Sequence, residues 1–254
     1  TGAVQFSEIY DGETQDFTLS PAAPQPAKLF DYGFDTIIGQ ENEPVRCLQR
    51  LPVVREFTAP NGDHLFDFGQ NLTGWVEVEI YGDKGQTLTL RHAESLDENG
   101  NFYTENLSWA KATDTYILSG GKQILHPHFT WHGFRYLCVE GLQYGQNVQF
   151  TACHLSTDLA QTGSFTCSDK RVNRLQQNIQ WSQRDNFLDI PTDCPQRSER
   201  LGWTGDVTAF CPTAAFNENI MPFMTKWLRD FASELGPDVS MPQVVPNILG
   251  NQQD

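Results

Sequence analysis

The stretch from residue 75 to residue 95, WVEVEIYGDKGQTLTLRHAES, alternates apolar and polar residues on both sides of a short polar turn. A period of two places the apolar side chains on one face of an extended chain and the charged ones on the other. Turn-forming residues at 82–85 separate the two runs. The pattern therefore predicts a β-hairpin with one buried face. Its buried positions are expected to be Val76, Val78, Ile80, Leu88 and Leu90.

Further short strands are predicted on both sides of this hairpin, each bounded by Gly, Asn, Asp or Pro. They lie at residues 64–69, 112–120, 129–141 and 147–155. Several short strands at this spacing are typical of an antiparallel β-sandwich, which we expect over residues 44–160. Residues 1–43 contain the Pro-rich passage SPAAPQPAKLFDYG. We expect this segment to be the end of a preceding β-domain followed by a linker.

The hydrophobic period changes to that of a helix after residue 160. Ser168 is a suitable N-cap, and Val172, Leu175 and Ile179 then recur at helical spacing. This pattern predicts that a helical region begins here.

A second helix is predicted over residues 219–236, where Gly236 provides the end signal. Its wide apolar stripe consists of Ile220, Phe223, Trp227, Phe231 and Leu235. At most three helices fit before residue 254, which is too few for a self-contained helical core. We therefore expect residues 161–254 to be the N-terminal part of a larger helical domain, and the chain to be an internal fragment.

Composition narrows the function classes. Seventeen basic and 32 acidic residues give a net charge of −15, which repels nucleic acid phosphates and anionic lipid. The N-terminal residues TGAVQFSEIYDGE lack the basic and apolar regions of a secretion signal, so a cytoplasmic location is expected. Six cysteines without a CxxC pair are expected to be reduced and mostly buried, including Cys194.

Residues 193–206, DCPQRSERLGWTGD, concentrate carboxylates, guanidinium groups and one indole in an irregular segment. Carboxylates accept hydrogen bonds from sugar hydroxyls, a carboxylic acid can donate a proton, and an aromatic ring stacks on an apolar sugar face. This combination favours a glycoside site. Ion pairs among Arg197, Glu199 and Arg200, with Trp203 in a core, are an equally good explanation from composition alone.

The same segment resembles the signature of the bacterial α-L-rhamnosidases, an inverting family with an (α/α)6 barrel as catalytic domain. Residues 66–121 and 129–141 resemble the β-sandwich that precedes the barrel, and 162–193 resemble the entry into it. The resemblance continues to about residue 248. It implies a multidomain β and α protein, in which an antiparallel β-sandwich is followed by the first helices of an incomplete (α/α)6 barrel.

The resemblance also implies roles for single residues. Glu199 matches the general acid that protonates the glycosidic oxygen, and Trp203 matches an aromatic wall of the sugar site. Asp193, Arg197 and Asp206 match residues that hold rhamnose hydroxyls. Ser198 stands where the family usually has Asp. The expected ligand is a rhamnose-containing glycoside or oligosaccharide, and no metal or other cofactor is implied.

Three other interpretations are weaker. A zinc site at His126, His128 and His132 lacks a Cys or carboxylate partner, and Pro127 interrupts the strand. A polysaccharide lyase would act on a polyanion, which the net charge of −15 repels.

A non-catalytic carbohydrate-binding module would need exposed aromatic platforms. Trp75, Trp109 and Trp131 lie in strand patterns, and we expect them in the core.

Residues 1–254 alone are expected not to hydrolyse rhamnosides at a useful rate. The resemblance places the general base of an inverting mechanism in a later part of the barrel, and general acid–base groups each contribute about 10²–10⁴-fold. Assaying the 254-residue chain on an aryl α-L-rhamnoside tests this expectation. Ordinary turnover by a chain of confirmed mass would mean that the base lies within these residues.

Overall fold

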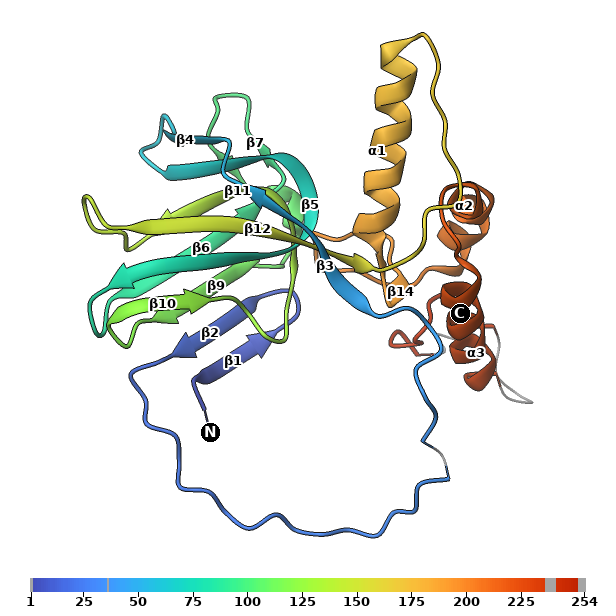
Figure 1. Ribbon diagram of the computed structural model, residues 1–254, viewed down its shortest axis with the longest axis horizontal. Coiled ribbons are helices and arrows are strands. Elements are labelled where there is room, and N and C mark those ends of the chain that lie inside the picture. Colours follow the sequence, from blue (N-terminus) through green and yellow to red (C-terminus); the bar gives the residue numbers. More distant parts are fainter. Residues whose placement is uncertain (1, 36, 236–240, 251–254) are drawn as a thin grey trace.

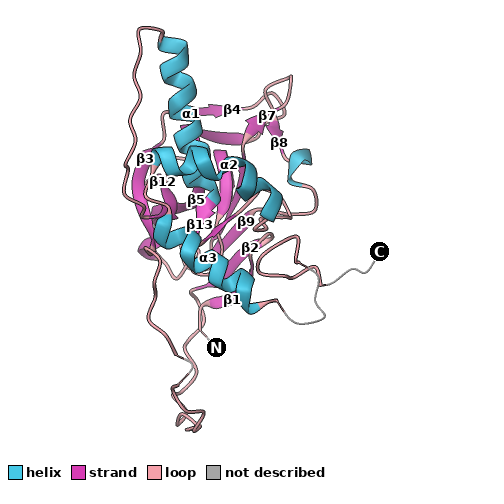
Figure 2. Ribbon diagram, turned by 90° about the vertical axis from the view of Figure 1, so that its right-hand side faces the viewer, coloured by secondary structure: helices cyan, strands magenta, loops and turns pink. Residues whose placement is uncertain are grey.

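The computed structural model describes residues 2–35, 37–235 and 241–250 and combines a β-rich part with a helical part (Figure 1). The strands are β1 (Val4–Glu8), β2 (Gly12–Asp16), β3 (Val45–Pro52), β4 (Arg55–Thr58), β5 (His64–Gly82), β6 (Thr87–Ala93), β7 (Ser95–Leu96), β8 (Phe102–Tyr103), β9 (Thr113–Ile117), β10 (Gly121–Leu125), β11 (His132–Glu140), β12 (Val148–Thr157), β13 (Phe187–Leu188) and β14 (Ile190–Pro191). The helices are η1 (Glu105–Leu107), α1 (Lys170–Asn186), α2 (Thr204–Asn217) and α3 (Met221–Ser233). Figure 2 faces the helical side and shows α1, α2 and α3 in front of the strands.

Strand β5 organises the ten-stranded sheet because it belongs to two sets of strands. Its first half pairs with β4 and β11, and its second half pairs with β10 and β12. The sheet continues in the order β1-β2-β9-β6-β11-β5-β12-β3. All neighbouring strands run antiparallel except β2 and β9, which are parallel.

The burial predicted for the 75–95 stretch is confirmed, but the predicted hairpin is wrong. All five expected apolar positions are at most 1 % exposed. Strand β6 pairs with β9 and β11, whereas the end of β5 pairs with β10 and β12. The turn at 82–86 thus joins two strands that do not pair. Period-two alternation defines which face is buried, and it says nothing about which strand becomes the neighbour.

The main core lies between the inward faces of these strands and is almost entirely apolar. Its buried members are Phe66, Phe68, Leu72, Val76, Val78, Ile80, Leu88, Leu90, Tyr116, Leu118, Leu125, Phe134, Leu137, Val139, Phe150 and Ala152. At about 25 cal/mol per Å² of buried apolar surface, a cluster of this size is the main source of stability for the β-rich part.

The first residues are part of the large sheet. Strand β2 pairs with β9 in the register Thr14 to Thr115. Glu13 is fully buried, and its carboxylate accepts hydrogen bonds from the backbone N–H groups of His128 and Phe129 at 2.9 and 3.0 Å. The N-terminal strands therefore fix the loop that precedes β11. The domain boundaries at 43 and 160 stay a prediction.

Helix α1 begins one residue later than the predicted cap allows. Asp169, not Ser168, is the N-cap, and its carboxylate accepts a hydrogen bond from the N–H of Arg171 at 2.9 Å. The predicted helix is confirmed, and two of its regularly spaced apolar residues, Val172 and Leu175, are 40 % and 57 % exposed. Among the described residues, this helix meets the sandwich through its last turns instead.

Helix α3 is shorter than the predicted 219–236, although the apolar stripe is largely confirmed. Its first three members are buried, Phe231 is half-buried and Leu235 is exposed. Phe223 stacks on Phe187 with ring centroids 4.5 Å apart, which packs α3 against the segment after α1. The predicted end signal at Gly236 lies outside the described residues.

Asp185 joins the helical part to the sandwich. Its carboxylate accepts a hydrogen bond from the Thr73 N–H at 2.9 Å, and its backbone carbonyl accepts one from the Thr73 hydroxyl at 2.7 Å. Nε2 of His154 lies 3.2 Å from the same carboxylate. Burial raises the pKa of Asp185, although His154 and the Thr73 N–H favour the charged form. A buried polar junction of this kind fixes the start of the helical part relative to β5 and β12.

The connection from residue 17 to residue 44 contains no helix or strand in its described residues and runs around the outside of the molecule (Figure 1). It exposes several large apolar side chains, namely Leu19, Leu29, Phe30, Tyr32, Phe34, Ile37 and Ile38. Within the described residues, no helix has the length and apolar character needed to cross a membrane.

Candidate functional site

The charged segment predicted as the site lies between β14 and α2, where residues 192–202 form an irregular loop. Its two ends are pinned to each other. The Asp193 N–H donates to the Leu201 carbonyl at 3.0 Å, and the Leu201 N–H donates to the Asp193 carboxylate at 2.8 Å. The loop therefore closes on itself and presents the side chains between these ends together.

The structure brings Glu199, Arg197 and Trp203 into direct contact. The indole N–H of Trp203 donates to one carboxylate oxygen of Glu199 at 2.9 Å, and Arg197 lies 2.7 Å from the other. The Glu199 side chain is 29 % exposed, so solvent or a ligand can reach it. The two donors fix the direction of the carboxylate, which suits a group that must meet one particular atom of a ligand.

Asp193 and Asp206 share a cavity of about 270 Å³. The Asp193 carboxylate accepts a hydrogen bond from the Leu201 N–H, and its other oxygen lies 3.7 Å from the guanidinium of Arg197. Asp206 is exposed in the first turn of α2, where the partial positive charge of a helix N-terminus favours a carboxylate. The cavity walls come entirely from residues 182–224, and Glu199 and Trp203 are not among the lining residues.

Arg200 anchors the loop to the sandwich and points away from the cavity. It is 5 % exposed, and its guanidinium donates to the backbone carbonyls of Ile9 and Trp131 at 2.8 and 2.7 Å. Two longer bonds join it to the carbonyls of Gln196 and Arg197. Burial lowers the pKa of Arg200 to about 10, so the group remains charged at neutral pH.

Aromatic rings complete this anchor. The guanidinium carbon of Arg200 lies 4.6 Å from the ring centroid of Trp131 and 5.4 Å from that of Tyr10, both within cation–π range. The Tyr10 hydroxyl also donates to the Glu199 carbonyl at 2.6 Å. Sequence reasoning assigned no role to Tyr10 because it is separated from Glu199 by 189 positions, and no local pattern links them.

The prediction that three tryptophans belong to the core holds only in part. Trp75 and Trp131 are half-buried, and Trp75 stacks on His126 with centroids 5.2 Å apart. Trp109 is 62 % exposed and follows η1 instead of lying in a strand. Its backbone N–H lies 3.4 Å from the hydroxyl of Ser198, the residue directly before Glu199.

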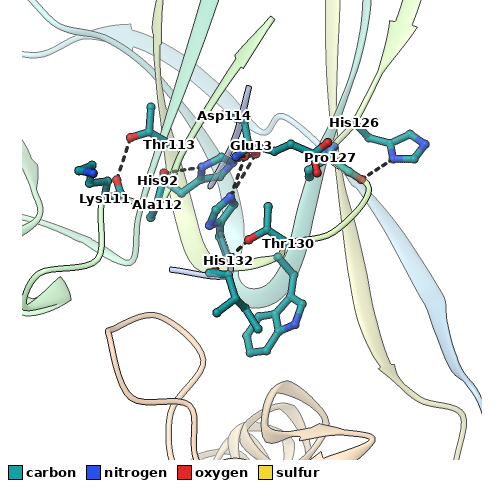
Figure 3. A network of polar contacts seen from close by, with 12 residues as sticks. Glu13, His92, Lys111, Ala112, Thr113, Asp114, His126, Pro127, Thr130 and His132 are labelled. Atoms are coloured by element: carbon teal, nitrogen blue, oxygen red, sulfur yellow. Dashed lines mark hydrogen bonds and ion pairs between the residues drawn. The ribbon is translucent and has the colours of Figure 1, made fainter. Parts of the chain in front are cut away.

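The three histidines of the 126–132 stretch do not form one cluster. His132 is fully buried, and its Nε2 lies 3.1 and 3.2 Å from the two carboxylate oxygens of Asp114 (Figure 3). The ring of His132 stacks on His92, whereas the exposed His128 meets His126 with ring centroids 5.0 Å apart. The weak zinc interpretation based on sequence spacing therefore has no geometric support, and the expected absence of a metal stays a prediction.

Cys194 has no feature of a nucleophile. Burial raises the pKa of its thiol to about 11, and its sulfur lies 3.5 Å from the N–H of Arg200. All six cysteines are unpaired; Cys138 and Cys153 are also buried, and the other three are not. The expectation of unpaired thiols is confirmed, and the expectation of general burial holds for half of them.

Comparison with family models decides the family. The bacterial alpha-L-rhamnosidase concanavalin-like domain matches residues 57–156, and the bacterial alpha-L-rhamnosidase 6 hairpin glycosidase domain matches residues 160–254. The chain belongs to the bacterial α-L-rhamnosidases. The expected fold class, a β-sandwich followed by the first helices of an (α/α) barrel, agrees with both matches.

Curated α-L-rhamnosidases are similar along almost the whole chain. The alpha-L-rhamnosidase of Streptomyces avermitilis is 40 % identical over 267 residues, covering 99 % of this chain and 26 % of the relative. One from Formosa agariphila is 34 % identical, covering 98 % of this chain and 28 % of the relative. The chain thus spans about a quarter of the length of the curated relatives it matches.

Two solved rhamnosidase structures have the same arrangement. The native enzyme from Aspergillus terreus superposes with a TM-score of 0.91 at 40 % identity, over 99 % of this chain and 31 % of that one. The Streptomyces avermitilis enzyme complexed with L-rhamnose gives a TM-score of 0.86 at 38 % identity, over 96 % of this chain and 25 % of that one. At these identities the likeness extends beyond the general architecture.

The buried His92 is expected to make the stability of this chain sensitive to acid. Burial, followed by the neighbouring His132, lowers the pKa of His92 to about 3, from an ordinary 6.5. The unfolded chain therefore binds a proton below pH 6.5 that the folded chain does not, and stability falls between pH 6.5 and 3. By pH 5 the loss relative to neutral pH is about 2 kcal/mol.

Urea unfolding of wild type and His92→Asn at pH 7.5 and pH 5 tests this expectation. Asn preserves a donor toward the Ala112 carbonyl, which His92 Nδ1 contacts at 2.9 Å, but does not titrate. The variant should lose less stability on acidification, and His128→Asn, at an exposed position, should behave as wild type. Parallel losses in wild type and His92→Asn would contradict the assignment.

Proposed function

We propose that the full-length protein carrying this chain is an α-L-rhamnosidase that hydrolyses terminal α-L-rhamnosyl residues from glycosides or oligosaccharides with inversion. The observation that carries the proposal is the convergence of Glu199, Arg197, Trp203 and Asp193 in one loop of a chain that belongs to this family. Neither a carbohydrate-binding module nor a polysaccharide lyase is favoured by the relatives, which are named as rhamnosidases.

Glu199 is the proposed general acid. It is partly exposed, and its carboxylate direction is fixed by the Trp203 N–H. Proton donation to the glycosidic oxygen requires one carboxyl oxygen to carry a proton and to face that oxygen, and we propose that Glu199 gives up one of its two present contacts in this step. Arg197 is the more mobile partner in this proposal, because its side chain is 46 % exposed and already lies between Glu199 and Asp193.

Asp193, Asp206, Arg197 and Trp203 are the proposed sugar contacts. The two aspartates line the same cavity, where their carboxylates can accept hydrogen bonds from sugar hydroxyls. Arg197 can donate to a ring or hydroxyl oxygen once it leaves Glu199, and the Trp203 indole offers an apolar wall. Ser198 contributes a hydroxyl where related sequences usually carry a carboxylate, so it adds no charge beside the acid.

Asp193 is too close to Glu199 to be the base of an inverting reaction. One carboxylate oxygen of Asp193 lies within 4.8 Å of one carboxylate oxygen of Glu199. An inverting pair is separated by about 6.5–9.5 Å, to leave room for the attacking water, whereas a retaining pair is about 5–5.5 Å apart. Under the proposed mechanism Asp193 binds sugar hydroxyls, and a different carboxylate activates the water from the opposite face.

Replacing Glu199 by Gln should lower turnover about 10²–10⁴-fold on rhamnosides with poor leaving groups and far less on activated aryl rhamnosides, which need little protonation. Steady-state kinetics on a rhamnosyl disaccharide and on p-nitrophenyl α-L-rhamnoside measure the difference. Glu98→Gln, at an exposed turn, is the matched control. Equal losses on both substrates would remove Glu199 from the acid role.

The first-formed product should be β-L-rhamnose. Proton NMR during the first minutes of hydrolysis, before mutarotation, distinguishes the two anomers. Inversion agrees with Asp193 as a sugar-binding residue. Formation of the α anomer would instead assign Asp193 as a nucleophile, since it is the carboxylate closest to Glu199 in the described part of the loop.

A further inference from the structure

Trp109 is an exposed aromatic side chain that the sandwich places beside the proposed acid. Trp109 is 62 % exposed, and its backbone N–H lies 3.4 Å from the Ser198 hydroxyl. The Ser198 N–H in turn lies 3.4 Å from the Leu107 carbonyl. Residues 107–109 are thus docked on the residue directly before Glu199.

The backbone around Trp109 is held in a costly conformation. Ser108 has a φ of 58° and Ala112 a φ of 45°, in the left-handed region that non-glycine residues rarely adopt. Leu107, Ala110 and Ala112 are buried and fix both sides of the segment. Strain of this kind persists only where the surroundings impose it, and it often accompanies a ligand-binding role.

The indole packs against one neighbouring ring. It meets Tyr10 in a T-shaped arrangement with centroids 5.0 Å apart, while Tyr10 is fixed by its hydrogen bond to the Glu199 carbonyl. Because Trp109 is 62 % exposed, apolar surface of the indole remains open to solvent. A ligand can cover the apolar face of the indole without breaking a hydrogen bond. The indole can therefore serve as a platform for another flat apolar surface.

The position of Trp109 relative to the cavity indicates which part of a substrate it would meet. The cavity that contains Asp193 and Asp206 is lined only by residues 182–224, whereas Trp109 comes from the sandwich and meets Ser198, the residue before the acid. A general acid must contact the oxygen that joins the rhamnosyl group to its leaving group. An aromatic residue that adjoins the acid without lining the sugar cavity is therefore a candidate for contact with the leaving group.

We propose that Trp109 is a leaving-group platform, which stacks on the flat apolar face of the ring attached to rhamnose and so favours ring-bearing substrates. This role rests on the proposed rhamnosidase function and adds a specificity determinant from the β-sandwich. The ring can be aromatic, as in an aryl glycoside, or a second sugar with an apolar face. Both kinds of ring offer a flat apolar surface, and comparing KM for an aryl substrate and a disaccharide distinguishes them.

Kinetics of the full-length protein on three substrates test the platform. The substrates are methyl α-L-rhamnoside, which has no ring in its leaving group, p-nitrophenyl α-L-rhamnoside and a rhamnosyl-glucose disaccharide. Trp109→Ala should raise KM about 3- to 10-fold for a ring-bearing substrate and leave kcat/KM for the methyl glycoside unchanged. Trp109→Phe should restore most of the affinity. A rise in KM for the aryl substrate alone identifies an aromatic ring as the preferred partner. A rise in KM for the disaccharide identifies a sugar ring.

Tyr144→Ala is the matched control, because Tyr144 is a fully exposed aromatic in the turn between β11 and β12. The Tyr144→Ala substitution should leave KM and kcat/KM unchanged for all three substrates. Equal losses on all substrates in Trp109→Ala, or no change on any, would overturn the platform while leaving the rhamnosidase function intact. A wild-type protein inactive on all three rhamnosides would overturn both.

Discussion

The arrangement of the site depends on one buried cation. Arg200 places its guanidinium inside the sandwich, where it bonds to carbonyls of the N-terminal strand connection and of the loop before β11. Hydrogen bonds from a charged group contribute about 1.5–3 kcal/mol each, and an unpaired buried charge is costly, so the loop cannot release Arg200 without losing all of them. Arg200 also donates to the carbonyls of Gln196 and Arg197, so it ties the middle of the loop to the same fixed point.

This anchor explains why charged residues with similar local sequence have different functions. Arg197 and Arg200 are three positions apart, yet one reaches Glu199 near the surface and the other is buried beneath the loop. Arg200 has a φ of 55°, which turns the chain so that its side chain leaves on the opposite side from Glu199. The loop therefore combines an exposed ionic pair for chemistry with a buried cation for position.

The β-sandwich is consequently part of the site and not only a support for it. Tyr10 and Trp109 both contact the 197–200 segment. A buried network of Glu13, Asp114, His132 and His92 links strands β2, β9, β11 and β6 of the adjoining sheet. General acid catalysis requires the proton donor to be within hydrogen-bond reach of a single oxygen, and small displacements are expensive. The loop is irregular by itself, and its contacts with the sandwich hold the proton donor in place as this requirement demands.

The sequence by itself determined the local features: the buried faces of the strands, the change from β to helical period near residue 160, and the residues of the charged loop. These follow from side-chain chemistry and short-range periodicity, which are properties of neighbouring positions. The sequence did not determine strand pairing, because β5 and β6 are adjacent in the chain but β11 lies between them in the sheet and pairs with both. The sequence also did not determine the contacts of Tyr10 and Trp109 with the loop, since these contacts join residues 189 and 89 positions apart. Only tertiary structure decides such contacts, because burial and hydrogen bonding depend on which surfaces meet in space and leave no periodic signal along the chain.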